Sequence, residues 1–198
     1  MARWQPDARG RLEQAAMELY VERGFDETTV AEIAKRAGLT ERTFFRHFSD
    51  KREVLFAGAA MLQDLFVGAV VDAPAALAPV DAAMAGVMAG GALLQERRDF
   101  ARRRYEIIAA NAELQERELI KLASLSAALA GALRRRGVPD HAASLAAEVA
   151  IAVFRVAFER WVCDPVHLDL PQLMRASLDE LRAVTADSDT GRPATARP

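Results

Sequence analysis

The chain has few of the residues that support covalent or metal chemistry. It contains one cysteine, Cys163, so no disulfide can form within the chain, and we expect the thiol to be buried in the core. Its three histidines show no paired metal-ligand spacing, and the sequence contains neither a glycine-rich phosphate loop nor a nucleophile elbow. We therefore predict no metal, no cofactor and no catalytic site.

Long uncharged apolar segments are also missing. The N-terminal stretch MARWQPDARG lacks the apolar core of a signal peptide, and every apolar run approaching the roughly twenty residues of a membrane span contains a charge. We expect no membrane partner and a cytoplasmic location. The 198 residues are 52% hydrophobic, which is enough for a sizeable core.

Charge is informative through its distribution and not through its total. The formal net charge is −2, and residues 1–56 hold ten basic and ten acidic side chains, so a strongly basic nucleic-acid binder is excluded. Residues 28–52, however, hold six basic side chains against three acidic ones. This local excess predicts a DNA-binding surface with a modest number of phosphate contacts.

Two short helices joined by a glycine turn are predicted within residues 28–51. Thr29 and Glu32 form a capping box that begins the first helix, and Gly38 is suited to end it. Thr40 then caps a second helix. This spacing is typical of a helix-turn-helix, which lays its second helix in the DNA major groove.

The second helix, residues 41–48, has two different faces. Phe44 and Phe48 lie four residues apart on an apolar back. The other side carries hydrogen-bonding side chains that remain available to a ligand: Arg42, Thr43, Arg46 and His47.

A larger set of residues, from about Arg11 to Leu55, carries a family resemblance: Ala15, Ala16, Leu19, Tyr20, Gly24, Phe25, Thr28, Thr29, Val30, Ile33, Ala34, Ala37, Gly38, Leu39, Thr40, Thr43, Phe44, Phe45, His47, Phe48 and Lys51. In this register they resemble the tetracycline-repressor (TetR) family of bacterial transcriptional regulators. The resemblance implies a repressor that binds an inverted-repeat double-stranded DNA operator as a homodimer and is released by a small-molecule effector. The effector itself cannot be identified from these residues.

Two positions depart from the family pattern. A tyrosine whose hydroxyl meets a phosphate usually stands where this chain has Phe45, and a small residue usually stands at Arg42. Phe45 is left with van der Waals contact only, whereas Arg42 adds a reader of bases or phosphates. The predicted DNA-binding residues are Thr28, Thr29, Thr40, Arg42, Thr43, Phe45, Arg46, His47 and Lys51.

The predicted fold is all-α, with a three-helix helix-turn-helix head on a larger helical bundle body and about nine helices in total. We divide the chain into a head (1–49), an effector-binding and dimerisation body (50–186) and a disordered tail (187–198). Body helices are expected near residues 50–70, 80–95, 97–110, 112–136, 140–162 and 171–184. The first is expected to be continuous, with Gly58 admitting a close neighbour, and Gly90–Gly91 is a weak point in the second.

The helix expected at residues 140–162 is apolar nearly all round and must be covered on more than one side. We assign one side to a partner subunit, as the resemblance implies for the last two helices. The predicted dimer-interface residues are Val149, Val153, Val156, Trp161, Leu173, Leu178 and Leu181.

The body is also expected to hold a small-molecule pocket. Flexible and aromatic side chains are able to line it, and the predicted ligand-binding residues are Met61, Phe66, Met84, Met88, Phe100, Tyr105, Phe154 and Phe158. A cluster of arginines at residues 97–104 is read as a solvated face that pairs with neighbouring acids, and the alternative is contact with an acidic effector or with a second run of phosphates.

Two alternatives remain open at this level. The chain is an all-helical enzyme or interaction module if residues 28–51 form only a structural hairpin, and the one pair of core-side charges available to such an enzyme is Glu148 with Arg155. Alternatively, it binds DNA as an activator without effector control.

Overall fold

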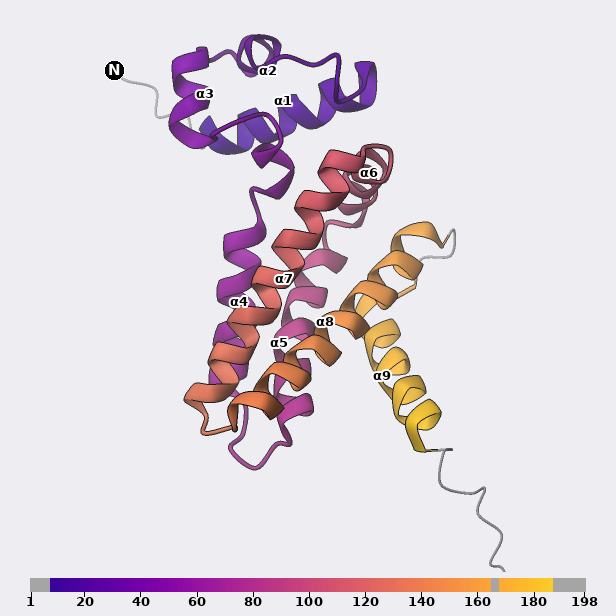
Figure 1. Cartoon of the computed structure of the whole chain (residues 1–198). Helices are drawn as coiled ribbons and strands as arrows, with labels where there is room; N and C mark the ends of the chain where they lie inside the picture. Colours follow the sequence, from indigo (N-terminus) through magenta and orange to yellow (C-terminus); the bar gives the residue numbers. More distant parts are fainter. Residues whose placement is uncertain (1–7, 165–167, 187–198) are drawn as a thin grey trace, which may run out of the picture.

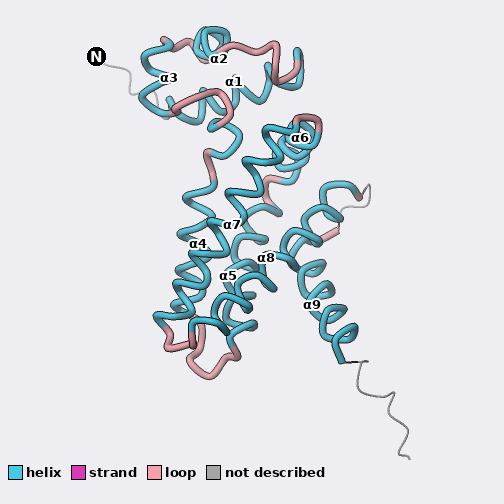
Figure 2. The backbone as a smooth tube through the Cα atoms, in the orientation of Figure 1, coloured by secondary structure: helices cyan, strands magenta, loops and turns pink. Residues whose placement is uncertain are grey.

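The computed structural model describes residues 8–164 and 168–186, and every regular element within these ranges is helical (Figures 1 and 2). The predicted all-α fold is confirmed. Three helices form the head: α1 (Ala8–Arg23), α2 (Val30–Arg36) and α3 (Glu41–His47). A short 3-10 helix, η1 (Glu53–Phe56), leads into the body, which contains α4 (Ala59–Asp72), α5 (Pro79–Gln95), α6 (Arg98–Ala109), α7 (Ala112–Arg135), α8 (Asp140–Cys163) and α9 (Leu170–Ala186).

The helix-turn-helix forms where the capping residues predict it. Thr29 Oγ1 accepts a hydrogen bond from the Glu32 backbone N–H at 3.2 Å, and the Glu32 carboxylate accepts one from the Thr29 N–H at 2.9 Å. Gly38 ends α2 at φ +65°, a left-handed conformation that favours glycine. Thr40 then caps α3 by accepting from the Thr43 N–H at 3.2 Å. Local sequence therefore determines this motif.

The single helix predicted for residues 50–70 is wrong. The Asp50 carboxylate accepts hydrogen bonds from the backbone N–H groups of Arg52 and Glu53, at 2.8 and 3.1 Å, and begins the separate turn η1. The chain then breaks at Gly58 before α4 begins. The residues of η1 pack into the head core whereas α4 packs into the body core, and glycine makes the interruption between them inexpensive. No atom outside its chain neighbours lies within 4 Å of a Cβ placed at Gly58, so the expected close approach does not occur there.

Close helix packing is found instead at the glycines of α5. A Cβ added at Gly90 would lie 2.2 Å from Phe66 Cε1 of α4, and one at Gly91 would lie 2.8 Å from Met174 Cε of α9. The predicted weak point is therefore part of a continuous helix. Its glycines let α4 and α9 approach α5 directly.

The body is a bundle in which α8 packs against α5, α6, α7 and α9 (Figure 1). Its core includes side chains with almost no exposed surface, among them Phe66, Leu129 and Trp161. Residues 53–72 and α8 are long and apolar enough to suit a membrane span, but core helices of soluble proteins share these properties. Both contribute side chains to the protein's two hydrophobic cores.

Four predicted dimer residues belong to this core. Val153, Trp161, Leu173 and Leu178 are buried within the single chain, with exposed fractions of 0–8%. They are covered by the chain's own helices, so their assignment to a subunit interface is corrected. Val156 and Leu181 remain exposed on α8 and α9, and Val149 is half-buried.

Candidate DNA-binding surface and ligand cavity

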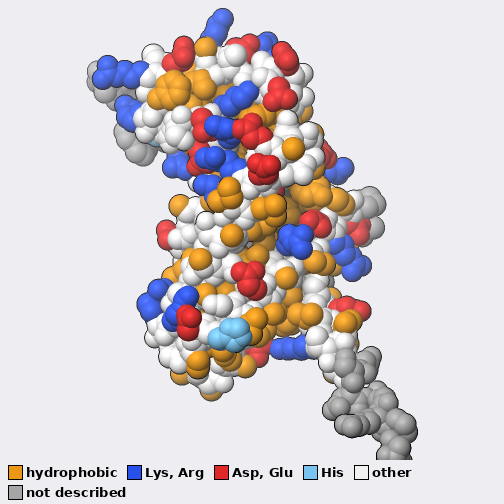
Figure 3. All heavy atoms as spheres, viewed as in Figure 1, with side chains coloured by type: hydrophobic (Ala, Val, Ile, Leu, Met, Phe, Trp, Pro, Cys, Tyr) orange, Lys and Arg blue, Asp and Glu red, His pale blue; other side chains and the backbone are white. Residues whose placement is uncertain are grey.

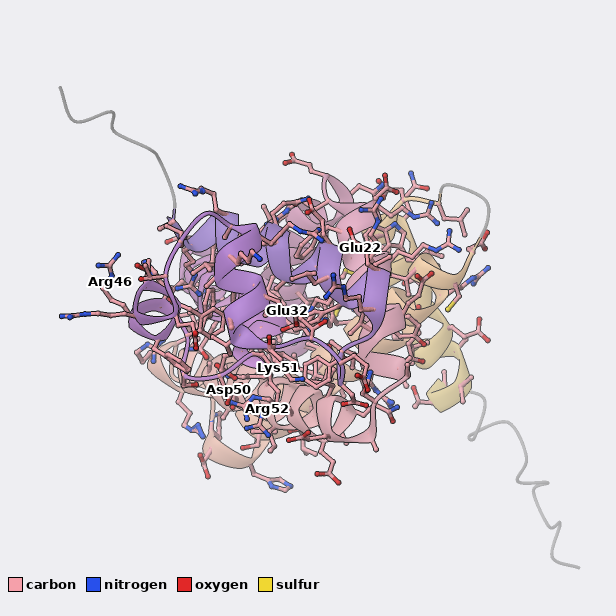
Figure 4. All side chains as sticks on the ribbon, turned by 90° about the horizontal axis from the view of Figure 1, so that it is seen from above. Glu22, Glu32, Arg46, Asp50, Lys51 and Arg52 are labelled. Atoms are coloured by element: carbon pink, nitrogen blue, oxygen red, sulfur yellow. The ribbon has the colours of Figure 1, made fainter. Side chains whose placement is uncertain are left out.

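The helix α3 presents an exposed face on a fixed back. Phe44 and Phe48 are buried in the head core, with exposed fractions of 0% and 4%, and they hold the helix against α1 and α2. Arg42, Phe45 and Arg46 are exposed on the other side. Figure 4 shows Arg46 at the outer edge of the head, pointing away from the protein. This face is free to enter a groove of DNA.

Three further predicted contact residues lie at or near the N-termini of α2 and α3. Thr29 and Thr40 are exposed at the helix N-termini, where backbone N–H groups favour a phosphate. Thr40 Oγ1 and Thr43 Oγ1 lie 3.0 Å apart. Contact of these three residues with DNA stays a prediction.

Thr28 and Lys51 are structural residues, which corrects their predicted role. The Thr28 side chain is 1% exposed and its hydroxyl donates to the Gly24 carbonyl at 2.8 Å. The Lys51 ammonium donates to the carbonyls of Phe25, Asp26 and Thr28 at 2.8–3.0 Å and lies over the Phe25 ring. An ammonium has three N–H donors, so none remains for a phosphate.

His47 is half-buried at the end of α3. Its Nε2 atom is buried and has no hydrogen-bond partner among the described residues. The ring therefore packs against the protein on that edge. Contact between His47 and DNA stays a prediction.

Ion pairs neutralise much of the charge on the head. Arg23 lies 2.6 Å from Glu32, and Arg36 lies 2.7 Å from Glu22, which lowers the pKa of the Glu22 carboxyl. Figure 3 shows the resulting mixture of basic and acidic side chains over the head. The local basic excess seen in the sequence is therefore not a uniformly basic surface.

A cavity of about 430 Å³ lies in the body where it meets the head, bounded by η1, α4, α5, α6, α7 and α8. Five predicted ligand residues line it, namely Met61, Phe100, Tyr105, Phe154 and Phe158. Leu55, Phe56, Gly58 and Ala59 belong to the same wall. The wall thus includes the segment that joins head and body.

Three predicted ligand residues do not line this cavity. Phe66 has no exposed surface because it fills the space left by Gly90, and Met84 is 5% exposed within the body core. Met88 is half-buried and packs on that core. Apolar character alone did not separate core residues from cavity residues.

The predicted ligand-binding residues do not include the polar wall of the cavity. Arg97, Arg104, Glu118, Arg155 and Glu159 all border it. Arg97, Phe100 and Arg104 recur at helical spacing within the arginine cluster, which was the available signal. The expected pairing of that cluster with neighbouring acids holds for Arg102, which meets Glu106 at 3.1 Å.

Arg104 has the most extensive contacts of these residues. Its Nε donates to the Leu55 carbonyl at 2.6 Å, its Nη1 meets Glu118 Oε1 at 2.9 Å, and its guanidinium lies 5.1 Å from the centre of the Phe56 ring. One side chain thus joins α6 and α7 to η1 at the cavity wall.

Two further expectations are corrected in the body. Cys163 is exposed at the end of α8 instead of buried. Near Cys163, the pKa of the Tyr105 phenol is raised. The larger cause is burial, and the second is the neighbouring Cys163. Glu148 and Arg155 are both exposed rather than core residues, and Glu148 accepts a hydrogen bond from Ser126 at 2.7 Å.

A helix-turn-helix head on an all-helical body with a cavity at their junction defines a class of DNA-binding regulators. The family model for bacterial regulatory proteins of the tetR family matches residues 13–57. The family model for the MftR C-terminal domain matches residues 77–186. The chain therefore belongs to the TetR family and is a DNA-binding transcriptional regulator, as the sequence predicted.

Individual relatives agree with this assignment. The regulator TcmR of Streptomyces glaucescens is 36% identical over 74 residues, which cover 37% of this chain and only 33% of TcmR. MftR of Mycobacterium tuberculosis is 23% identical over 175 residues, which cover 87% of this chain and 88% of MftR. The match to TcmR thus has the higher identity but is short, whereas the match to MftR extends through the body.

Solved structures share the whole fold. A complex of SmeT, the efflux-pump repressor of Stenotrophomonas maltophilia, with triclosan has a TM-score of 0.64 and 23% identity, covering 96% of this chain and 98% of that one. Thermus thermophilus FadR with lauroyl-CoA has a TM-score of 0.56 and 23% identity, covering 96% and 99%. At this identity the likeness shows the fold alone.

Proposed function

We propose that this regulator is a repressor that occupies an inverted-repeat operator as a homodimer in the cytoplasm and leaves it when a small amphipathic effector fills the cavity. One observation carries the proposal: the cavity and the head share η1, whose Leu55 and Phe56 border the cavity while they pack into the head core. An effector that displaces these side chains acts directly on the head.

Arg104 supplies the second part of the coupling. Its side chain binds the Leu55 carbonyl of η1 and the Glu118 carboxylate of α7 at the same time. While both contacts persist, α7 and η1 move together. An effector that binds the two arrangements with different affinities shifts the balance between them. The DNA-binding arrangement is then depopulated by the bound effector.

The lining favours an effector with both apolar and polar parts. Leu62, Leu122 and Phe158 provide apolar contact, and Arg155 and Glu159 provide exposed charged groups at the cavity. Triclosan and lauroyl-CoA, which occupy the similar chains of SmeT and FadR, both combine apolar and polar groups. They are therefore suitable first ligands for an experiment.

Dimerisation is proposed through the surface left exposed on α8 and α9. Leu145 and Val156 are 55% and 54% exposed on α8, and Leu181 and Val184 are 36% and 64% exposed on α9. Exposed large apolar side chains on adjacent helices suit a two-fold contact with a second copy. Such a dimer would place two α3 helices about one DNA turn, roughly 34 Å, apart.

Three measurements test the proposal. The first selects an operator from a random double-stranded DNA library, and we expect an inverted repeat. The second follows operator binding by fluorescence anisotropy while triclosan or lauroyl-CoA is added, and we expect at least one to release the DNA. Leu122→Trp, which fills the cavity, should abolish that release, whereas Leu77→Trp in the exposed α4–α5 loop should not.

The third measurement tests the oligomer. Sedimentation should give a dimer for the native chain and a monomer for Val156→Glu, with Val71→Glu as an exposed control on α4. A monomeric native chain, or an operator that is a single asymmetric site, would refute the dimeric repressor. Ligands that bind the cavity but never change operator affinity would refute effector control.

A further inference from the structure

The head arginines divide into two groups according to their contacts. Five of those described have partners within the chain. Arg9 meets Glu13, Arg23 meets Glu32, Arg36 meets Glu22, Arg52 meets Asp50 and Glu113, and Arg11 donates to the Ala37 carbonyl. Within the described part of the head, Arg42 and Arg46 are the arginines that have no ion pair or hydrogen bond of their side chains.

Arg42 and Arg46 also share one face. They are four residues apart on α3, and both are exposed, so their side chains start about 6 Å apart along the helix. Glu41 is exposed beside them but forms no ion pair with either. The buried Phe44 and Phe48 fix the direction in which both guanidinium groups project. Neither arginine is needed to hold the head together.

Guanine is the base that an arginine side chain on a recognition helix contacts most often. The guanidinium donates two parallel hydrogen bonds to O6 and N7 of guanine in the major groove, which is the commonest specific contact between a side chain and a base. Phosphate contacts, by contrast, set the register of the protein on the duplex, and they come from basic and hydroxyl side chains and from helix N-termini. Thr29 and Thr40 are the N-caps of α2 and α3, and Lys35 is exposed in the last turn of α2.

We propose that each operator half-site contains two guanines, one read by Arg42 and the other by Arg46. The starting points of the two side chains are about 6 Å apart and base pairs stack about 3.4 Å apart, so the guanines lie within about two base steps of each other, on either strand. This inference rests on the proposed operator binding and adds the identity of bases within the operator.

The test uses the full-length protein and the operator obtained by selection. Each guanine of the half-site is replaced in turn by 7-deazaguanine, which lacks the N7 acceptor. We expect two positions at which this change weakens binding about 10- to 100-fold. At one of these positions, the 7-deazaguanine change should cause no further loss of affinity in Arg42→Ala. At the other position, it should cause no further loss of affinity in Arg46→Ala.

Lys35→Ala provides the matched control. Its loss should weaken binding equally on operator and on unrelated DNA, and should lower the slope of log Kd against log salt by about one. The two arginine variants should instead lose more affinity for the operator than for unrelated DNA. Circular dichroism and the melting temperature establish that all three variants remain folded.

The outcomes separate the inference from the function on which it rests. An enriched repeat without guanines under α3, or one in which 7-deazaguanine is harmless, overturns the inference and leaves operator binding intact. Arginine variants that behave like Lys35→Ala assign both side chains to phosphates and overturn it as well. A selection that enriches no sequence overturns the inference together with the proposed function.

Discussion

Arg104 of α6 donates a hydrogen bond of 2.6 Å to the backbone carbonyl of Leu55 in η1. Because Arg104 borders the cavity and Leu55 belongs to the head core, this bond crosses from the ligand site to the DNA-binding unit. It gives the proposed effector a short path to the head. The same bond also predicts a stability effect.

Arg104→Met should lower the free energy of unfolding by about 1–3 kcal/mol, because it removes a hydrogen bond and leaves Glu118 partly buried without its cation. Arg102→Met on the same helix is the control. Its exposed pair with Glu106 should contribute about 0.5 kcal/mol or less. Urea denaturation measures both, and equal losses in the two variants would contradict a special role for Arg104.

Gly90→Ala should destabilise the body by roughly 1–3 kcal/mol, because its Cβ would lie 2.2 Å from the buried Phe66 ring. Gly58→Ala should be neutral or should stabilise by up to about 1 kcal/mol. Gly58 is exposed, has φ −80° and leaves open space for a Cβ. Thermal unfolding of the pair distinguishes steric packing from helix propensity, and a stabilising Gly90→Ala would show that α4 and α5 separate readily.

Lys51→Met should lower head stability by about 1–3 kcal/mol, because three carbonyls lose the ammonium that joins them. Its effect on the salt dependence of DNA binding should be negligible. Lys35→Met should show the reverse, with unchanged stability and a smaller salt slope. A reduced salt slope in Lys51→Met, with normal melting, would restore Lys51 as a phosphate contact.

Stability at acid pH should depend on Asp50. Burial acts to raise the pKa of this carboxyl, but hydrogen bonds from the Arg52 side chain and the Glu53 N–H outweigh it and hold the pKa below its ordinary value. The unfolded chain therefore binds this proton more readily, so the contribution is present above the unfolded pKa, near 4, and is lost as pH falls through the folded pKa.

Asp50→Asn should consequently lose about 1 kcal/mol at pH 7 and converge with the native protein at the lowest pH. The free energy of unfolding measured in urea between pH 7 and pH 2 tests this. Asp64→Asn on the exposed surface of α4 serves as the control and should follow the native curve. A constant difference between Asp50→Asn and the native chain at every pH would contradict the linkage.

Local sequence determined the helix-turn-helix. The capping box of Thr29 with Glu32, the turn at Gly38 and the cap at Thr40 all act through neighbours within a few residues, so spacing alone predicts them. The apolar periodicity of the body likewise predicted its helices, except for the break at Gly58 between η1 and α4. Family membership followed from the same residues, because few folds combine them in this register.

Tertiary structure decided which of these residues are free to bind. Lys51 and Arg46 look alike in sequence, yet three backbone carbonyls use the Lys51 ammonium while Arg46 projects outward (Figure 4). Phe66 and Phe158 look alike too, but Phe66 packs into the room left by Gly90, whereas Phe158 lines the cavity. Partners far along the chain make these distinctions, and periodicity carries no information about them.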